Sequence, residues 1–411
     1  MPPPNPHAIA PADAEVLKPL ADKVAALAAL PVQDERRRLW KRLNRLQAVR
    51  PLLHICQVPW HEFNDEAMRL RCRGDLARQV ESQLRRTLWP WEHFPADDVV
   101  EPAVTIGAAK TESDWGLPLV KREHAAAVAY PPLIRCPDDV RKIRTPEIRA
   151  DHQTTAARAA ALEAVFGGTL RVEPQTMVVP AMWDLLIQWY GTKELMIDLV
   201  DRPDLVHAAA RRTTDMLLAR MKQLEAEGLL FLNNRNHGAG NGGLAYTDEL
   251  PQADFDGRVR LCDLWGNQMA QIFSGVSPAM HDAFALAYEI DILRHFGLNN
   301  YGCCEPLDWK VAIVRKIPRL RRISMSPWVD WRRGAQAVGT DFVYSAKPNP
   351  AYLAGETWDP RPAETQIRHI LDATRGLRVE IVLKDIHTLR GQPERLAAWH
   401  RMAVRLIEQY G

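Results

Sequence analysis

Residues 298–346 read LNNYGCCEPLDWKVAIVRKIPRLRRISMSPWVDWRRGAQAVGTDFVYSA, and this stretch decides the expected fold. It contains short apolar or β-branched runs separated by stretches with apolar residues at helical spacing. The runs lie at 298–303, 322–326 and 342–345, and the helical stretches lie at 307–316 and 331–338. Short runs bounded by turn residues are typical of buried strands. Strands that alternate with helices form βαβ units, so the stretch predicts a parallel sheet.

The same alternation extends over most of the chain. Further strand candidates lie at 103–106, 172–179, 229–233, 259–264 and 380–383. Eight strands with intervening helices predict an α/β fold of the (β/α)8 TIM-barrel type over residues 96–411. The first 95 residues are mostly helical in pattern, with one short strand candidate at 52–56, so we expect a helical N-terminal extension at 1–95. A doubly wound open sheet is the alternative, but the glycine run at 238–243 does not lie directly between a strand and a long helix.

Charge and composition exclude several classes of partner. The chain of 411 residues has 53 basic and 51 acidic side chains, too balanced to hold a nucleic acid or an anionic membrane. No apolar stretch approaches the roughly 20 residues that span a bilayer. Residues 1–7 show neither a basic leader nor an apolar core, so we expect a cytoplasmic protein. Six cysteines are too few for a disulfide scaffold, and we expect free thiols. The oligomeric state stays open, a homodimer included.

Polar and aromatic residues follow the predicted strands, where a barrel carries its active site. The candidates for substrate binding are residues whose rings or polar groups suit a pocket for a flat or apolar molecule. They are His237, Asn234, Trp265, Trp328, Tyr301 and Lys347. An H-x-C pair, His54 and Cys56, resembles a metal-binding pair, but it precedes the barrel pattern and we assign it to packing.

The triplet Cys303-Cys304-Glu305 is the sharpest chemical feature. Thiolates are soft ligands that bind zinc at neutral pH, and a catalytic zinc keeps one position open. The candidate metal ligands are Cys303, Cys304, Glu305 and His237. Strand alternation places Cys303 and Glu305 on one face and Cys304 on the other, unless the backbone turns. The alternative is a buried apolar cysteine with Glu305 capping the next helix.

Three ionisable residues crowd after the last predicted strand: Lys384, Asp385 and His387. On a strand Asp385 and His387 face the same way, so the carboxylate would hold the imidazole in one tautomer. We expect these residues to perform acid–base catalysis, with the role of Lys384 less defined. A surface ion pair at a helix start is the alternative.

Four segments carry a resemblance to a known family. They are GCCEPL at 302–307, ISMSPW at 323–328, SAKPNP at 345–350 and LKDIH at 383–387. From about Glu173 onward the chain resembles the uroporphyrinogen decarboxylase-like superfamily of (β/α)8 barrels. Within it, the chain is similar to the corrinoid-dependent methyltransferases, which include the methyltransferase components of O-demethylases.

Members of that branch bind zinc with a histidine-x-cysteine pair and a further cysteine after the last strand. In this chain Cys303 matches, Tyr301 replaces the histidine, and the last cysteine falls near Ile386. Zinc would therefore need a different ligand set. That set would be drawn from His237, Cys303, Cys304, Glu305, Asp385 and His387.

The resemblance implies transfer of a methyl group from a small methoxylated or methylated donor, with an aryl methyl ether favoured, to cobalamin. An ether oxygen leaves only when a Lewis acid or a proton donor stabilises it, which zinc with Lys384 or His387 would provide. The sequence has no Asp-x-His-x-x-Gly motif, so the cobalamin would be carried by a separate corrinoid protein. Three alternatives stay open: a corrinoid-independent zinc methyltransferase of the methionine synthase type, a metal-free decarboxylase-like lyase, and a non-enzymatic binding protein.

Overall fold

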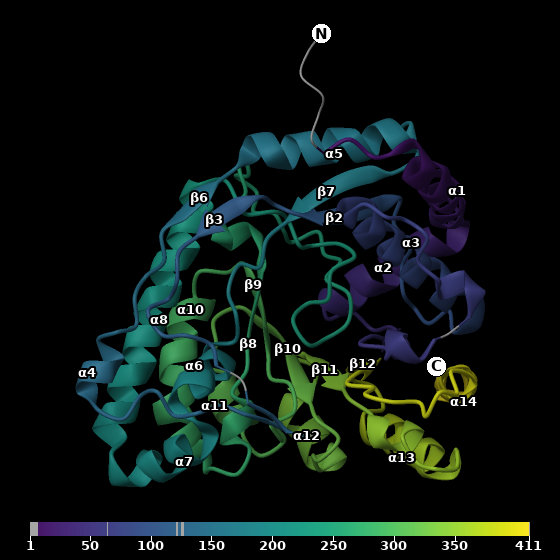
Figure 1. The fold of residues 1–411 in the computed structure, drawn as a ribbon. Coiled ribbons are helices and arrows are strands. Elements are labelled where there is room, and N and C mark those ends of the chain that lie inside the picture. Colours follow the sequence, from purple (N-terminus) through teal and green to yellow (C-terminus); the bar gives the residue numbers. More distant parts are fainter. Residues whose placement is uncertain (1–6, 64, 121, 125–126, 411) are drawn as a thin grey trace.

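The centre of the fold is a six-stranded parallel sheet in the order β1-β12-β11-β10-β9-β8, flanked by helices (Figure 1). The computed structural model describes residues 7–63, 65–120, 122–124 and 127–410. Within these ranges, no helix combines the length and the apolar character that crossing a membrane requires.

The strands are β1 (Leu52–Ile55), β2 (Ala103–Gly107), β3 (Lys110–Glu112), β4 (Arg122–His124), β5 (Ala127–Ala129), β6 (Ile148–Ala150), β7 (Arg171–Gln175), β8 (Trp265–Gln268), β9 (Leu298–Tyr301), β10 (Leu320–Met325), β11 (Val343–Ala346) and β12 (Arg378–Leu383). The helices are α1 (Pro11–Ala28), α2 (Pro31–Asn44), α3 (Asp75–His93), α4 (Pro137–Val140), α5 (His152–Phe166), α6 (Met182–Tyr190), α7 (Thr192–Asp201), α8 (Pro203–Ala226), α9 (Pro278–Met280), α10 (Ala287–Leu293), α11 (Val311–Val314), α12 (Trp331–Val338), α13 (Arg361–Ala373) and α14 (Glu394–Tyr410). A π-helical turn, His281–Leu286, joins α9 to α10.

Alternation along the strands separates an apolar face from a polar face. Ile323 and Met325 of β10 and Ile381 of β12 belong to the large apolar core that α11 to α14 cover. The intervening residues Arg322 and Glu380 point to the other face and are fully buried. The site described below lies at the end of this polar face.

The expected parallel α/β architecture is confirmed, but a closed barrel is not shown. From β8 to β12 each strand pairs with the next, as in a barrel wall, without the reversal of order that a doubly wound sheet has. The candidates at 103–106 and 172–179 became β2 and β7, which pair with each other and not with the main sheet. Burial alternates along β2, and the two strands share a separate core with α1, α3 and α5, above the main sheet in Figure 1.

Two other strand candidates differ from their expected form. Residues 229–233 form no strand ladder, because the Asn233 side chain exchanges hydrogen bonds with the backbone N–H and C=O of Trp265 at 2.9 and 3.0 Å. The candidate at 259–264 contains a 3-10 turn in which Asp263 accepts the Arg260 N–H, so β8 begins only at Trp265.

One strand of the main sheet comes from the part of the chain expected to be a helical extension. β1 pairs with β12 in parallel, with Leu53 opposite Ile381. The domain boundary near residue 95 stays a prediction. We expected His54 and Cys56 to pack in that extension. His54 lies in β1, and Cys56 directly follows it, at the same end of the sheet as the C-terminus of β12.

The glycine run packs against the polar face of the sheet. Gly243 N–H donates to Glu380 Oε1 at 2.9 Å, and Glu380 also pairs with Arg322 at 3.2 Å. A Cβ on Gly242 would collide with Arg322, and one on Gly243 would collide with Trp40. Only glycine permits this close approach, so the run serves packing and does not form a phosphate-binding turn.

Candidate functional site

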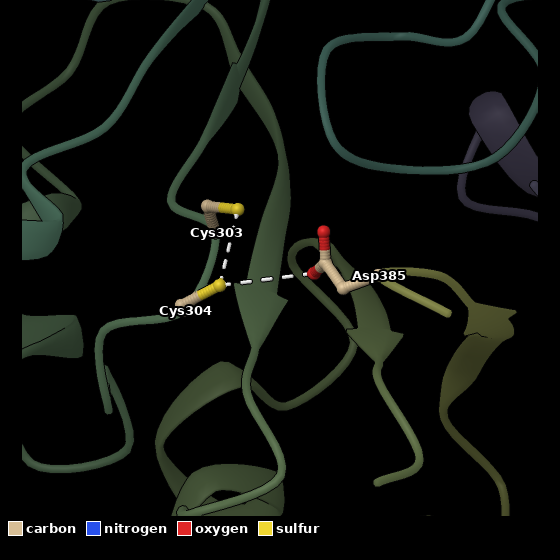
Figure 2. A group of neighbouring side chains, drawn as sticks. All are labelled: Cys303, Cys304 and Asp385. Carbon is tan, nitrogen blue, oxygen red and sulfur yellow. Dashed lines mark hydrogen bonds between the residues drawn. The ribbon is translucent and has the colours of Figure 1, made fainter. Parts of the chain in front are cut away.

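Two loops that follow strands β9 and β12 meet at one edge of the sheet (Figure 2). Ligand atoms of Cys303, Cys304 and Asp385 all lie within 4.8 Å of one another, and we call these residues the thiol cluster. Three strand spacings separate β9 from β12, which is roughly 14 Å in a flat sheet. Contact between the loops therefore requires the sheet to curl, and both loops to turn toward the polar face.

The turn after β9 brings the adjacent cysteines together. β9 ends at Tyr301, and Gly302 adopts φ +94°, where a Cβ would also meet Leu307. The strand alternation therefore stops, and the two sulfur atoms of Cys303 and Cys304 lie 3.5 Å apart.

Glu305 stabilises this turn through hydrogen bonds to the backbone. It is fully buried, and its two carboxylate oxygens accept the backbone N–H groups of Cys303 and Ala270, each at 2.9 Å. Both oxygens are thus engaged by the backbone, and Glu305 lies outside the thiol cluster. It acts as a clamp on the turn.

Lys384 places an ammonium group beside the cluster. Its Nζ lies 3.2 Å from Cys303 Sγ, 3.0 Å from Asn241 Oδ1 and 3.5 Å from Asp385 Oδ2. Burial alone would lower the pKa of Lys384, but Cys303 and Asp385 together raise it above its ordinary value. Lys384 therefore holds its proton at neutral pH.

The two thiols have opposite tendencies. The hydrogen bond from Cys304 lowers the pKa of Cys303 against the effect of burial, and Lys384 and Lys347 lower it further. The same contact and burial raise the pKa of Cys304. Cys303 is therefore the thiol that ionises first.

Asp385 reaches the cluster through an unusual backbone conformation. Its φ is +57°, and its N–H donates to the side-chain oxygen of Gln57 at 3.1 Å. Gln57 also has a positive φ, of +54°. Left-handed conformations at non-glycine residues are strained and collect at functional sites. The ends of β1 and β12 are thus tied together at the cluster.

His387 and His237, both expected at the site, lie outside the thiol cluster. β12 ends at Leu383 and Asp385 turns the chain, so Asp385 and His387 do not share a strand face, and His387 is exposed. His237 is half-buried, burial lowers its pKa, and its Nδ1 has no hydrogen-bond partner among the described residues. Their catalytic and binding roles stay predictions.

Lys347 lies close enough to influence Cys303. Its Nζ donates to Ser345 Oγ at 3.0 Å, and burial lowers the pKa of Lys347 to about 8. It is almost fully buried at the end of β11. Of the residues expected to bind substrate, it is the one whose charge acts on the thiol cluster.

The remaining residues expected to bind substrate have other surroundings. Tyr301 is fully buried, and its hydroxyl lies 2.7 Å from both His281 Nε2 and Glu289 Oε2. Trp265 is buried and donates to the Ala245 carbonyl at 3.0 Å. Asn234 donates to the Leu250 carbonyl at 2.6 Å, and Trp328 is 69% exposed.

Sequence patterns missed several side chains at the site. Asn241, inside the glycine run, donates to the Gly302 carbonyl and to Met269 Sδ, each at 3.2 Å, while it accepts from Lys384. Nearby, burial raises the pKa of Asp184 to about 6. A run of glycines around one asparagine was the available signal, because it indicates a close backbone approach.

The cluster fits a zinc ion by its donor chemistry. Cys304 Sγ lies 3.5 Å from Cys303 Sγ and 3.8 Å from Asp385 Oδ2. Ligands of a tetrahedral zinc, bound at about 2.3 Å for sulfur and 2.0–2.2 Å for oxygen, lie roughly 3.5–3.8 Å from each other. Two sulfurs and one carboxylate would leave a fourth position for a substrate.

Comparison with known proteins finds structural similarity but no match by sequence. No protein-family model matches the chain, and no curated protein matches it. A solved structure of a methyltransferase from Methanosarcina mazei is similar, with 10% identity and a TM-score of 0.47, over 91% of this chain and 98% of that chain. What the site can do therefore follows from its own residues.

Proposed function

We propose that the protein transfers a methyl group from a small methoxylated or methylated donor to the cobalamin of a separate corrinoid protein. An aryl methyl ether is the favoured donor. The observation that carries the proposal is the thiol cluster, in which two thiols and a carboxylate lie within 4.8 Å of one another at the C-terminal edge of a parallel sheet. The sequence resemblance assigns methyl transfer to the same segments.

Cys303, Cys304 and Asp385 would hold the zinc ion. When bound, zinc would supply Lewis acidity to the oxygen that leaves the methyl group. The low pKa of Cys303 suits this role, because a thiolate is the form that binds metal.

Lys384 would donate the proton that completes the reaction. The carbon–oxygen bond of the ether breaks, the methyl carbon forms its new bond to the cobalt of the partner, and the oxygen gains a proton. Lys384 holds such a proton, and Asn241 fixes its Nζ through a hydrogen bond of 3.0 Å. Asn241 also donates to the Gly302 carbonyl. It therefore holds the Lys384 ammonium group in a fixed position relative to the turn that carries Cys303 and Cys304.

A metal-free lyase is the second candidate, and one contact favours it. Lys384 Nζ lies 3.2 Å from Cys303 Sγ, so a thiolate there already has a cation beside it. In that case the purified protein would contain no zinc, and Lys384 would act on the carboxylate of a substrate.

The test is a methyl-transfer assay with purified protein, a reduced corrinoid protein and a panel of aryl ethers, methylamines and thioethers. We expect the absorption change from cob(I)alamin to methylcobalamin with at least one donor. The Cys303→Ser/Cys304→Ser variant serves as the negative control. Absence of transfer across the panel would reject methyl transfer to a corrinoid and favour the lyase.

A further inference from the structure

A cavity of about 330 Å³ lies at the C-terminal end of β1. Residues of β1, α3 and the segment that contains the glycine run line it. Gln57 belongs to this wall, and its side-chain oxygen accepts the Asp385 N–H at 3.1 Å. Gln57 therefore connects the cavity wall to the backbone of a residue in the thiol cluster.

Part of the cavity wall is aromatic. Trp60, Trp91 and Phe94 line it, together with Pro90 and Pro95. Its volume lies at the lower end of the roughly 300–1,000 Å³ range of ligand pockets. Aromatic side chains on part of the wall of a space of this size suit one aromatic ring with small substituents, and the volume excludes a corrin macrocycle.

Basic side chains outnumber acidic ones in the lining of the cavity. Arg36 gives its hydrogen bonds to the neutral carbonyl oxygens of Asp98 and Pro95, at 2.7 and 3.0 Å. The Arg86 guanidinium lies over the Trp60 ring at 5.6 Å and makes no hydrogen bond or ion pair with any residue in the described part of the chain. Asp98 is the one carboxylate in the lining, and it pairs with His54.

The His54–Asp98 pair does not cancel the two arginines. Burial alone would lower the pKa of His54, but Asp98 raises it well above its ordinary value, so the pair is an imidazolium with a carboxylate. Arg86 is exposed, and its guanidinium has unused donors. Guanidinium groups bind carboxylates through two parallel hydrogen bonds.

The geometry points to a binding site for an aromatic carboxylate, with the ring against Trp60 and Trp91 and the carboxylate on Arg86. The identification of this ligand as the methyl donor rests on the proposed function, because only then must the ring lie beside the thiol cluster. Binding itself is independent of the reaction.

The experiment is calorimetric titration of the full-length protein without metal or corrinoid. The probes are para-methoxybenzoate and its neutral analogue para-methoxybenzamide. We expect the benzoate to bind about tenfold tighter than the amide, a difference of about 1.4 kcal/mol. Arg86→Gln should remove that preference, and Arg405→Gln, which changes an exposed arginine on α14, should leave it intact.

Equal affinity for both probes, or a preference that survives Arg86→Gln, would overturn the assignment. Benzoate binding without any methyl transfer would support the site and reject the proposed reaction. Methyl transfer from neutral donors by a protein that does not bind the benzoate would support the reaction and reject the site.

Discussion

Lys384 is the residue on which the proposed proton transfer depends. Its Nζ touches the sulfur of Cys303, and the surrounding negative groups keep it protonated. The sequence pattern instead favoured His387, which is exposed and lies outside the thiol cluster. The two assignments make different predictions.

We predict that Lys384→Met lowers turnover by about 100-fold or more, the usual range for a general acid, and that His387→Ala lowers it less. Thermal melting and zinc content of both variants serve as controls for folding and metal retention. If His387→Ala is the more damaging substitution, the proton donor is His387, as the sequence pattern predicted.

At the residue scale the sequence pattern pointed to the side chains that follow strand ends, but not to the amide side chains that contact them. Cys303, Cys304, Lys384 and Asp385 stand out because reactive residues follow predicted strands, and the structure brings them together. Gln57 and Asn241 contact the same group from distant segments. Gln57 carries no sequence signal, and the glycine run around Asn241 indicates a close backbone approach without indicating its partner, so the tertiary structure is needed to place both side chains.

The turn after β9 is the element that converts adjacent cysteines into a cluster. Gly302 supplies the left-handed backbone, and Glu305 binds the N–H groups of Cys303 and Ala270. The clamp links this turn to the loop that follows β8. Its removal should loosen the spacing of the thiols without removing either one.

Glu305→Gln should therefore weaken both zinc retention and stability. An amide nitrogen would face one of the two backbone N–H groups, leaving a buried donor unpaired at a cost of about 1–3 kcal/mol. Chemical denaturation and a zinc competition assay measure the two effects. The matched change Glu364→Gln, in an ion pair on α13, should alter stability by less than about 1 kcal/mol. A Glu305→Gln protein that resembles the wild type in both assays would show that the turn needs no clamp.

At the element scale, apolar runs predicted β9 to β12 because these strands are buried on both faces. The pattern failed where side chains replaced backbone pairing, as Asn233 does beside β8. It identified the strand candidate at 52–56 but not its place in the main sheet, because the surrounding helical patterns assigned that segment to the extension.

A buried polar chain joins the helical layer to the sheet. Lys310 Nζ lies 3.3 Å from His281 Nδ1, and Tyr301 connects His281 to Glu289 at the end of β9. Burial raises the pKa of Glu289 to about 8 and lowers that of His281 to about 3. Near neutral pH the chain therefore holds a protonated carboxyl and a neutral imidazole.

Glu289 should make stability depend on pH. The unfolded chain ionises this carboxyl near its ordinary value of 4.5, whereas the folded protein keeps the proton up to about pH 8. Stability therefore falls as pH rises through this window. Glu289→Gln does not titrate, so its free energy of unfolding relative to the wild type should be greater at pH 8 than at pH 5, by roughly 1–4 kcal/mol. Parallel denaturant titrations at both pH values measure the difference, and an equal difference at both would contradict the account.

At the whole-molecule scale, the sequence predicted a parallel α/β protein but not how its strands pair. Periodicity indicates which face of a strand is buried, but it does not indicate which strand pairs with it. β2 and β7 show the consequence, since their apolar faces pack on α1, α3 and α5 and not in the main sheet. The curl of the sheet that unites β9 with β12 is likewise a property of the assembled fold.

Zinc content tests the central claim most directly. Elemental analysis should find about one zinc per chain in the wild type, and almost none in the Cys303→Ser/Cys304→Ser variant, with the same circular dichroism and melting behaviour. Metal-free wild-type protein, or full zinc occupancy in the double variant, would contradict a zinc site at the thiol cluster.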